Sequence, residues 1–529
     1  MASFVNENLL NAFSDGKKTL LKELLSNTDM SVQERWFRIT TEILEPTVPF
    51  NVHMELYKLN YGAFRDYESP AWFPNNHVVK NKGSSFTVSK TNKLHNRMTN
   101  IERIMKAKGL TTYSQFYDWS VGMQTCEEYW DTCIKALDIQ FETPYSKVFD
   151  YSATPAAPAG APAGEAPVAD PHYGIKSVEY LKGARFNVAD SCFPRAYLEN
   201  PTETTPPAVV FASDSNPTLQ YYTHAELSLF SNQVALALST RLDLRVGDAI
   251  GICMPMTPES IAVYLGIIKA GFAVVSIADS FSAIEIATRM KLSRAKVIVT
   301  QDVIGRGDKI LPLYTRVLEA QPANVVVIPY SATRQIDPSV VLRESVAGDA
   351  KVLDANIYDL LPSITSDAVR NYKSVVRTSD AVCNILFSSG TTGEPKAIPW
   401  FHSTPIKSAV DGHIHQDIQE GDVACWPTNL GWMMGPWILF QLVNKGTIAI
   451  YNGVSTTFGF MQFVQDAKVN MLGVVPSIVK AWKNVTEKQT ALLKEKARKE
   501  MDTRERSGSG KKCLACIVVL WCCMACISH

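Results

Sequence analysis

Between residues 248 and 300, continuous hydrophobic segments alternate with segments in which apolar and polar residues are mixed. Nearly continuous apolar runs at 248–254, 271–277 and 295–300 are separated by two helix candidates, 258–270 and 283–292. Short strands that are apolar at almost every position are typical of a parallel sheet covered by helices on both faces. Strands that alternate with helices therefore predict an α/β architecture for this part of the chain.

Apolar runs beyond residue 300 extend the same pattern. Further strands are predicted at 325–329, 382–387, 447–451 and 469–475. Before residue 150 the pattern differs, because aromatic residues are scattered and residues 127–137 place apolar positions at helical spacing. We therefore expect a mostly helical N-terminal cap before the α/β region.

Two segments without a buried face divide the chain. Residues 153–167 read ATPAAPAGAPAGEAP, which predicts a flexible, partly extended linker. Residues 487–506 are highly charged and predict a solvated helix. The expected domains are an N-terminal cap at 1–151, a linker or loop at 152–170, an α/β domain at 171–483, and a divergent charged and cysteine-rich tail at 484–529.

Composition and charge exclude several classes of protein. The chain has 529 residues and 46 % hydrophobic content, enough for more than one globular domain. Lys plus Arg and Asp plus Glu both number 52, and this balance argues against a nucleic-acid-binding protein. The N-terminus has no basic start followed by an apolar run, so we expect no secretory signal. Six cysteines scattered before the tail are typical of reduced thiols in a reducing compartment.

The predicted strand at 382–387 leads into a run rich in hydroxyl groups and glycine. That run is Ser388-Ser389-Gly390-Thr391-Thr392-Gly393-Glu394-Pro395-Lys396. Its glycines allow a positive φ and close approach to a ligand, and its hydroxyl and backbone N–H groups suit phosphate oxygens. The final lysine adds a compact positive charge. The alternative is a polar surface turn. A Walker loop is excluded, because Ala397 stands where Ser or Thr would be needed.

This run resembles the signature loop of the ANL adenylating superfamily, which includes acyl-CoA synthetases. Other blocks agree in order, namely Thr223-His224-Ala225-Glu226-Leu227, the strand and helix at 248–270, and residues 421–453 with a T-x-x-GW-x-x-G stretch. The chain is similar to the acetyl-CoA synthetase branch, and in particular to plant peroxisomal acyl-activating enzymes, over roughly residues 30–483. The resemblance implies an incomplete ANL-type adenylation core with parallel sheets flanked by helices.

By this resemblance the chain would use ATP, Mg²⁺ and coenzyme A to activate a small carboxylic acid. Lys396, Thr391 and Thr392 would stabilise charge at the reacting phosphates. The rest of the nucleotide-binding loop would be Ser388, Ser389, Gly390, Gly393 and Glu394. Because the substrate carboxylate attacks the α-phosphate, catalysis would depend on positioning and charge stabilisation and would need no protein nucleophile.

The resemblance also assigns an acyl pocket. Trp432, Met433 and Met434 would set its size, since methionine adapts well to apolar chains. Ordinary core packing is the alternative for these three residues. Thr428 would lie near the phosphates, although a threonine before a turn is also common.

Two cations would contact the phosphates of coenzyme A by the same resemblance. They are Arg306 and Lys309, and a solvated loop is the alternative for both. Asp279-Ser280-Phe281-Ser282 departs from the acetyl-CoA synthetase pattern, in which a Gly-Gly pair usually precedes the phenylalanine. We expect His402, which follows the phosphate loop, to be a packing or hydrogen-bonding residue and not a base.

Later blocks of the family are not recognised after Lys483. The resemblance implies an adenine-stacking block that helps bind magnesium, an aspartate for the ribose, and a C-terminal domain with a lysine. No residue is assigned to these roles, and no metal ligand is predicted. We therefore hypothesise a truncated or spliced form with impaired ligase activity. The alternative is a non-catalytic remnant that binds nucleotide weakly or acts through an interaction.

The tail allows three interpretations. Cys513-x-x-Cys516 and Cys523-x-x-Cys526 have the spacing of a zinc knuckle, and Lys511-Lys512 beside cysteines would suit a palmitoylated membrane patch. We favour the third, a sequence without a selected role. The apolar run at 514–527 has 14 residues, fewer than the roughly 18 of a spanning helix. The chain does not end in an S-K-L type address, so a cytoplasmic location is expected, with the peroxisome as the family-based alternative. The oligomeric state is not predicted.

Overall fold

The computed structural model describes most of the chain between residues 98 and 483. The described ranges are 7–10, 12–27, 29–30, 32–44, 48, 50–61, 98–150, 178–307, 309–343, 354–388 and 394–483. The predicted linker at 152–170, the charged helix at 487–506, the whole tail and residues 389–393 of the phosphate loop lie outside them. The chain forms two compact units, Met98–Val474 and a second unit from Met1–Arg97 with Val475–His529.

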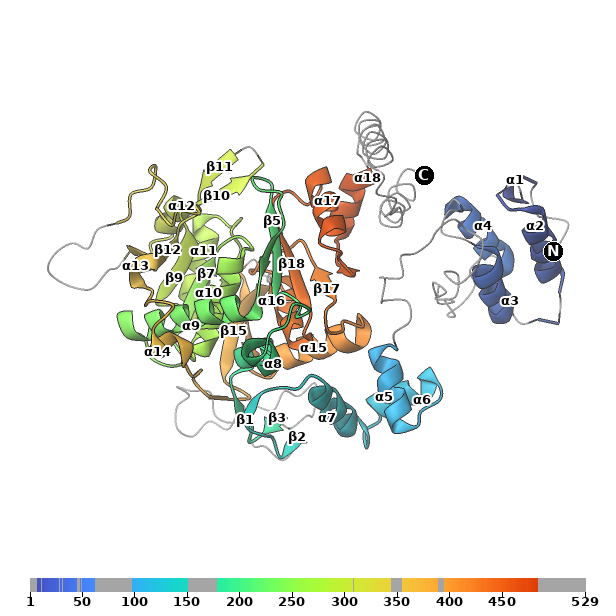
Figure 1. Ribbon diagram of the computed structural model, residues 1–529, viewed down its shortest axis with the longest axis horizontal. Helices are drawn as coiled ribbons and strands as arrows, with labels where there is room; N and C mark the ends of the chain where they lie inside the picture. The colour runs from blue at the N-terminus through green and yellow to red at the C-terminus, as the bar shows by residue number, and fades with distance from the viewer. Residues whose placement is uncertain are drawn as a thin grey trace. The chain divides into compact units, whose positions relative to one another are not determined.

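The larger unit is built around a seven-stranded sheet with the order β13-β12-β9-β7-β8-β15-β16 (Figure 1). In that order the strands are Asp354–Asn356, Val325–Ile328, Val297–Gln301, Ala249–Cys253, Ala273–Ile277, Val382–Ser388 and Lys396–Phe401. All neighbours pair in parallel except β15 and β16, which form an antiparallel hairpin. Every residue of β7, β8 and β9 is buried, as their continuous apolar runs predict.

A second sheet of five strands has the order β19-β17-β18-β5-β6. Its strands are Met471–Leu472, Val423–Cys425, Thr447–Asn452, Val209–Ser213 and Gln220–Tyr222. Only β5 and β6 pair antiparallel. Residues of both sheets belong to one continuous hydrophobic core, so the two sheets form a single packed body.

The remaining strands form three smaller sheets. They are β1 (Phe141–Thr143), β4 (Arg185–Phe186) and β14 (Arg377–Thr378); β2 (Lys147–Asp150) and β3 (Glu179–Lys182); and β10 (Val303–Arg306) and β11 (Lys309–Pro312). The β10–β11 hairpin lies at the edge of the larger unit in Figure 1.

Helices cover both faces of the seven-stranded sheet. Side chains of α10 (Pro258–Lys269) pack with Ile250 and Ile252 of β7 in one core cluster. Side chains of α11 (Ala283–Ser293) and α12 (Leu313–Glu319) pack with Ala249 and Cys253 of the same strand in another cluster. Because successive strand residues point to opposite faces, these two clusters lie on opposite sides of the sheet. The expected α/β fold with parallel sheets flanked by helices is confirmed.

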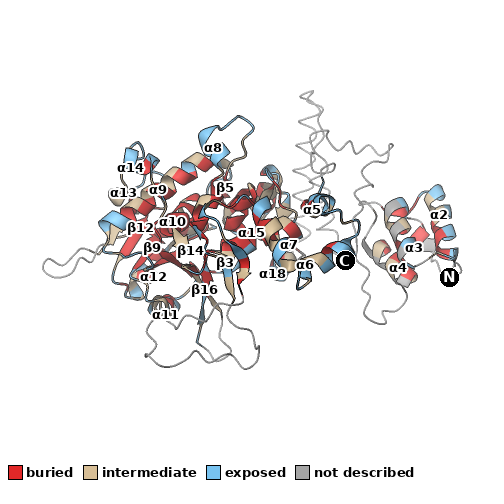
Figure 2. Ribbon diagram, turned by 90° about the horizontal axis from the view of Figure 1, so that it is seen from below, coloured by how far each residue is buried: buried red, intermediate tan, exposed pale blue. Residues whose placement is uncertain are grey.

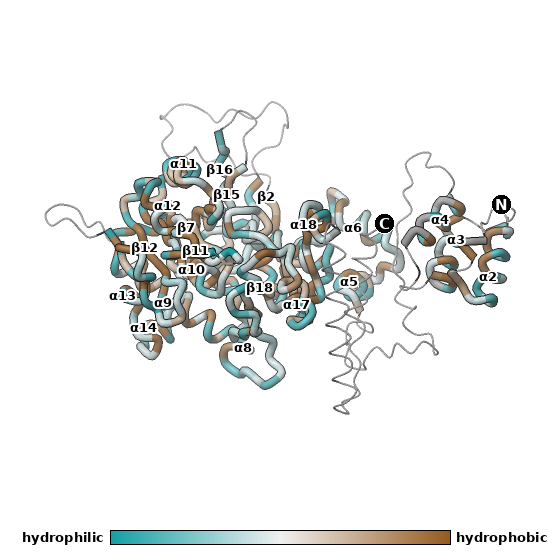
Figure 3. Tube along the Cα trace, turned by 90° about the horizontal axis from the view of Figure 1, so that it is seen from above, coloured by the Kyte–Doolittle hydropathy of each residue, from teal (hydrophilic) through white to brown (hydrophobic). Residues whose placement is uncertain are grey.

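Helix α10 lies at the centre of the larger unit. It is buried at almost every position, and Figures 2 and 3 show burial and hydrophobic residues concentrated in this region and in the strands around it. Its neighbour α9 (His224–Arg241) approaches closely at Gly266, where a Cβ atom would lie 2.8 Å from Val234. A glycine at this position therefore lets the two helices pack together.

The remaining helices of the larger unit surround this core. They are α5 (Asn100–Lys108), α6 (Tyr113–Val121), α7 (Cys126–Ala136), η5 (Val188–Cys192), α8 (Arg195–Glu199), α13 (Ile357–Leu360), α14 (Asp367–Arg370), α15 (Thr404–His415), α16 (Met434–Leu439), η6 (Phe440–Asn444) and α17 (Phe458–Asp466). Helix α7 confirms the helix predicted at 127–137. No helix in the described ranges is long and apolar enough to cross a membrane. The six described cysteines are free thiols, as their irregular spacing predicts.

The smaller unit is helical in its described parts. Its elements are α1 (Glu7–Leu10), α2 (Asp15–Ser26), α3 (Val32–Arg38), the π-helical turn η2 (Ile39–Ile43), α4 (Phe50–Tyr61) and α18 (Pro476–Lys483). Leu21, Ile39 and Leu56 are fully buried in a hydrophobic cluster of this unit. The cluster gives the N-terminal helices a core of their own.

The strand expected at 469–475 is shorter than predicted. Only Met471–Leu472 forms β19. The following Gly473 donates its N–H to the carbonyl oxygen of Cys425 at 2.8 Å, and a Cβ atom there would lie 1.8 Å from the Trp426 ring. Pro476 then begins α18, so the apolar run continues into a helix.

His402 is fully buried in the core of the larger unit. Its Nδ1 accepts a hydrogen bond from the N–H of Val188 at 3.2 Å, and its ring meets Phe186 edge-on with centroids 5.9 Å apart. The expectation of a packing and hydrogen-bonding residue is confirmed. Burial, with a smaller effect of Arg377, lowers the pKa of His402 to about 3.

Acid is therefore expected to destabilise the larger unit. The unfolded chain protonates His402 near the ordinary histidine pKa of about 6.5, whereas the folded chain keeps this ring neutral. The contribution of His402 to stability is full above about pH 6.5 and falls by about 1.5 kcal/mol as the pH drops from 6.5 to 5. Urea unfolding at pH 7, 6 and 5 measures this loss. His402→Asn keeps an acceptor without a titrating ring, so its stability should fall less; equal slopes for both proteins would contradict the prediction.

Candidate functional site

The β15–β16 hairpin presents the predicted phosphate loop. β15 lies parallel to β8 in the seven-stranded sheet, and Ser388 at its end is paired with Lys396 at the start of β16. Ser388 and Lys396 are thus brought together at the loop end of one hairpin. Glu394 and Lys396 are exposed. Ser389, Gly390, Thr391, Thr392 and Gly393 fall outside the described residues.

A buried carboxylate lies beyond the end of the neighbouring strand β8. Asp279 is 4 % exposed and accepts hydrogen bonds from the Arg306 guanidinium and, at 2.8 Å, from Nδ2 of Asn429. Its backbone carbonyl oxygen accepts from Nη1 of Arg316 at 2.8 Å. Burial raises the pKa of Asp279, and the charges of Arg306 and Arg316 act against this shift.

This cluster joins the carboxyl ends of the two sheets. Asp279 follows β8 of the large sheet, whereas Asn429 follows β17 of the second sheet. Asn452 ends β18, and its Oδ1 accepts from Nη1 of Arg306 at 3.0 Å. In open α/β sheets, ligands bind in the crevice outside the carboxyl ends of the strands. The Asp279 cluster therefore fixes the relative position of the two strand ends at which a ligand is expected.

Arg306 and Lys309 lie opposite each other in the β10–β11 hairpin. The Arg306 guanidinium is engaged by Asp279 and Asn452 and is 34 % exposed, whereas Lys309 is exposed. Any phosphate that contacts Arg306 would have to share its donors with these two partners. Lys309 is the more accessible cation of the pair.

The predicted acyl-pocket residues divide into two groups. Trp432 and Met433 are 52 % and 62 % exposed, at the turn before α16. Met434 begins α16 and is half-buried against the main core, and Thr428 is half-buried in the preceding segment. Packing therefore accounts for Met434, whereas Trp432 and Met433 remain free to contact a ligand.

Gly431 holds this turn against the end of β8. Its N–H donates to Oδ1 of Asn429 at 2.8 Å, and a Cβ atom on it would lie 2.2 Å from the backbone nitrogen of Ala278. The side chain of Asn429 thus contacts both the Asp279 carboxylate and the Trp432 turn.

An aromatic and cationic series connects the Trp432 turn with β15. The Trp432 ring meets Phe281 edge-on at 5.7 Å between centroids. The guanidinium of Arg289, on α11, lies 3.9 Å from the Phe281 ring centroid and 5.4 Å from that of Phe387. Phe387 directly precedes Ser388 in β15. The structure therefore brings the predicted acyl-pocket turn and the phosphate hairpin into one region.

The sequence reasoning did not assign Asp279, Asn429, Phe281 or Arg289 to the site. A usable signal was present for Asp279, a polar residue two positions after a predicted buried strand. The roles of Asn429 and Arg289 depend on contacts with distant segments and leave no local pattern. The described residues contain no group of three or more His, Cys, Asp or Glu side chains that could hold a metal ion.

Fold and site together define an α/β protein with a candidate ligand site where the carboxyl ends of two mostly parallel sheets meet. The chain belongs to the AMP-binding enzyme family, whose model matches residues 198–520. The match continues past Lys483, where the family pattern was expected to end.

Curated relatives agree with this family. The chain is 35 % identical over 488 residues to "Probable acyl-activating enzyme 17, peroxisomal" of Arabidopsis thaliana, covering 89 % of this chain and 60 % of the relative. It is 37 % identical over 482 residues to "Hexanoyl-CoA synthase" of Cannabis sativa, covering 88 % and 59 %. The chain thus spans about three fifths of the length of these relatives.

A solved structure shows the same fold. The acetoacetyl-CoA synthetase of Streptomyces lividans aligns with a TM-score of 0.59 and 22 % identity, covering 73 % of this chain and 54 % of that chain. The expected resemblance to the ANL superfamily and its acetyl-CoA synthetase-like members is confirmed.

Proposed function

We propose that this chain takes part in ATP-dependent ligation of a small carboxylic acid to coenzyme A. A carboxylate oxygen attacks the α-phosphorus of ATP and pyrophosphate leaves; the thiol sulfur then attacks the acyl carbon, AMP leaves and the thiol proton is released. The observation that carries the proposal is the Ser388–Lys396 hairpin beside the Asp279 cluster, at the carboxyl ends of both sheets.

The described residues fit a triphosphate at this place. Ser388 and Lys396 supply a hydroxyl donor and a cation at paired positions, as phosphate oxygens require. We propose that Thr391, Thr392 and Lys396 stabilise the charge on the reacting phosphates, and that the other loop residues supply donors. ATP would bring Mg²⁺ with it, and Lys309 and Arg306 would face the phosphates of coenzyme A.

We propose a short or medium acyl chain for the substrate. Trp432 and Met433 offer exposed apolar surface beside Phe281, and Thr428 lies in the segment that leads to them. One relative is named for hexanoyl-CoA and the structural neighbour for acetoacetyl-CoA, which supports acids of this size.

The alternative is nucleotide binding without turnover. It rests on the absence of a recognised adenine-stacking block after Lys483, although the family model matches residues as far as 520. Exchange of labelled pyrophosphate into ATP with acetate, butyrate and hexanoate separates the two proposals. Exchange supports the ligase, whereas ATP binding by equilibrium dialysis without exchange supports the alternative. A nucleic-acid partner is not proposed, since charge is balanced.

Two observations bear on the cellular compartment of this chain, and they favour different compartments. The sequence reasoning favours the cytoplasm, while relatives named as peroxisomal favour the peroxisome. We retain both as proposals, and fractionation of cells that express the untagged chain decides between them.

Lys396→Ala is expected to reduce pyrophosphate exchange by about 10–100-fold, because it removes a cation aimed at developing phosphate charge. Lys407→Ala is the matched control: Lys407 lies on the nearby α15, is 60 % exposed and, among the described residues, pairs with Asp411 one turn away. The control should keep its exchange rate within about twofold, since exposed pairs contribute little. Equal rates for both variants would remove Lys396 from the mechanism.

A further inference from the structure

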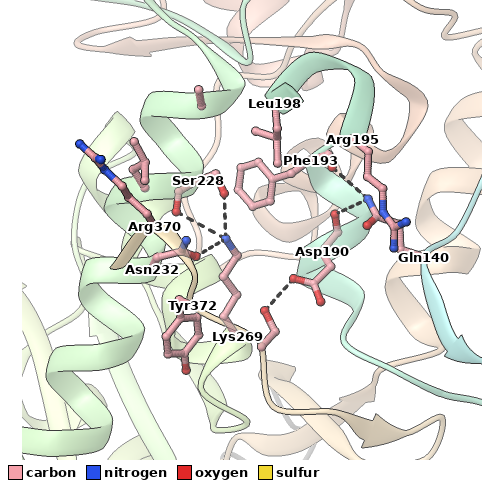
Figure 4. Close-up of a pocket in the computed structure, with 13 residues that line it drawn as sticks. Gln140, Asp190, Phe193, Arg195, Leu198, Ser228, Asn232, Lys269, Arg370 and Tyr372 are labelled. Carbon is pink, nitrogen blue, oxygen red and sulfur yellow. Dashed lines mark hydrogen bonds between the residues drawn. The ribbon is translucent and has the colours of Figure 1, made fainter. Parts of the chain in front are cut away.

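A cavity of about 350 Å³ lies near the amino end of β8, away from the carboxyl ends of the strands (Figure 4). Lys269, at the end of α10, lies in it and precedes β8, whereas Asp279 follows β8. The length of this five-residue strand, about 16 Å, therefore separates the cavity from the Asp279 cluster. Its volume is within the range of small-molecule sites, about 300–1,000 Å³.

Lys269 is the main polar group inside the cavity. It is 3 % exposed, and its ammonium group donates to Oδ1 of Asn232 at 2.8 Å and to Oγ of Ser228 at 3.2 Å. A third contact, with the carbonyl oxygen of Ser228, is long at 3.5 Å. The ammonium also lies 4.2 Å from the centroid of the Phe193 ring. One of its three N–H donors is thus weakly used, and a better acceptor could take it.

The Ser228 hydroxyl offers a second donor. Its oxygen accepts from Lys269, and no described residue accepts its own proton. Asn232 is held in place by donation from its Nδ2 to the carbonyl oxygen of Val369 at 3.0 Å, so its oxygen stays directed at Lys269. Two adjacent donors, one of them charged, are what a carboxylate accepts from.

Asp190 limits the charge that this cavity can hold. It is half-buried and accepts from Oγ of Ser374 at 2.6 Å, and no ion pair joins it to Lys269 within the described residues. Burial lowers the pKa of Lys269 to about 8 and raises that of Asp190. Lys269 supplies one positive charge for an added carboxylate, and the nearby Asp190 carboxylate would repel a dianion more strongly than a monoanion.

The remaining surface of the cavity is suited to a short apolar chain. Phe193, Leu198, Leu229 and Tyr372 supply apolar lining. Arg195 and Arg370 lie at the exposed rim, and Figure 4 shows their guanidinium groups directed away from Lys269. These rim charges would attract an anion without contacting it at the bottom of the cavity.

We propose that the Lys269 cavity is a second binding site, for a short-chain monocarboxylate, separate from the site at the carboxyl ends of the sheets. The carboxylate accepts from the Lys269 ammonium and the Ser228 hydroxyl, and the alkyl chain lies against Phe193 and Leu198. The proposal is independent of ligase activity, because it rests on residues outside the phosphate hairpin and the Asp279 cluster.

Binding of ¹³C-labelled butyrate to the full chain, followed by NMR titration without ATP, tests this site. Lys269→Met is expected to weaken binding at least tenfold. Leu198→Trp keeps the buried lysine and fills the mouth from a position that is 37 % exposed, so we expect this variant to fold normally. It should weaken butyrate at least fivefold.

Specificity and a matched control complete the test. Trp432→Ala, in the proposed acyl pocket, should leave the butyrate binding that Leu198→Trp weakens within twofold, which separates this site from the one proposed for the substrate. Succinate and inorganic phosphate should bind at least tenfold more weakly than butyrate. Unchanged butyrate affinity in Leu198→Trp, or binding of succinate or phosphate as tight as that of butyrate, would overturn the proposal.

Discussion

Replacing Asp279 by alanine is expected to lower the free energy of unfolding of the Met98–Val474 unit by about 2–4 kcal/mol. Removing one partner of a buried ion pair leaves the other charge uncompensated, which costs about 3–5 kcal/mol in proteins. The cost here is at the lower end, since the Arg306 side chain is 34 % exposed and can turn toward water. The change also leaves the amide of Asn429 without its 2.8 Å acceptor. Urea unfolding followed by tryptophan fluorescence measures the loss.

Two control variants test whether the loss of stability comes from the buried position and the charge of Asp279. Asp411→Ala removes an acid from the partly exposed pair with Lys407 on α15, and its effect should stay within about 1 kcal/mol. Asp279→Asn keeps the shape and one acceptor oxygen but removes the charge. It should lie between wild type and Asp279→Ala. An Asp279→Asn variant as stable as wild type would show that the carboxyl group is neutral in the folded protein and that charge contributes nothing to the cluster.

The strands between residues 248 and 300 could be predicted because their chemistry is local. Each is a short, continuous apolar run, and burial on both faces requires such a run. The helices between them were predicted at 258–270 and 283–292, and the structure shows matching ends: Pro258 stands in the first turn of α10, and Ser282 with Glu285 forms a capping box at α11. Here periodicity and end signals agree.

Pairing between distant segments could not be predicted in the same way. β8 lies beside β15, although more than a hundred residues separate them in sequence. The antiparallel strand β16, which contains Lys396 and Trp400, was not predicted. Most of its positions are exposed. An edge strand of this kind has one unpaired side and needs no continuous hydrophobic pattern.

The candidate site shows the same division. The Ser388–Lys396 run was recognised from residue types alone, because phosphate binding needs donors and glycines close together in sequence. Asp279, Asn429 and Arg306 come from three distant segments, and their contacts exist only after both sheets have packed together. Arg306 was assigned to coenzyme A by the family resemblance, and the structure adds a buried carboxylate partner, Asp279, that no local sequence pattern predicts.

Gly431→Ala is expected to destabilise the same unit by about 2–4 kcal/mol and to displace the Trp432 turn. A methyl group there would lie 2.2 Å from the nitrogen and 2.6 Å from the Cα of Ala278, and both are backbone atoms of a buried strand end. Such a contact cannot be relieved by a rotamer change, so the turn or β8 must move. Movement would lengthen the 2.8 Å bond from Gly431 to Asn429 and disturb the Asp279 cluster.

Met433→Ala is the matched control for Gly431→Ala, because it alters the same turn at a side chain that is 62 % exposed. Its effect on stability should stay within about 0.5 kcal/mol. Paired urea unfolding curves and acrylamide quenching of tryptophan fluorescence report stability and turn position together. If Gly431→Ala proves as stable as Met433→Ala, the close approach of the turn to Ala278 is wrong. A destabilised Gly431→Ala variant can be compared with wild type for butyrate binding in the Lys269 cavity. Unchanged affinity would show that the two ends of β8 behave as separate sites, because a steric change at one end does not reach the other.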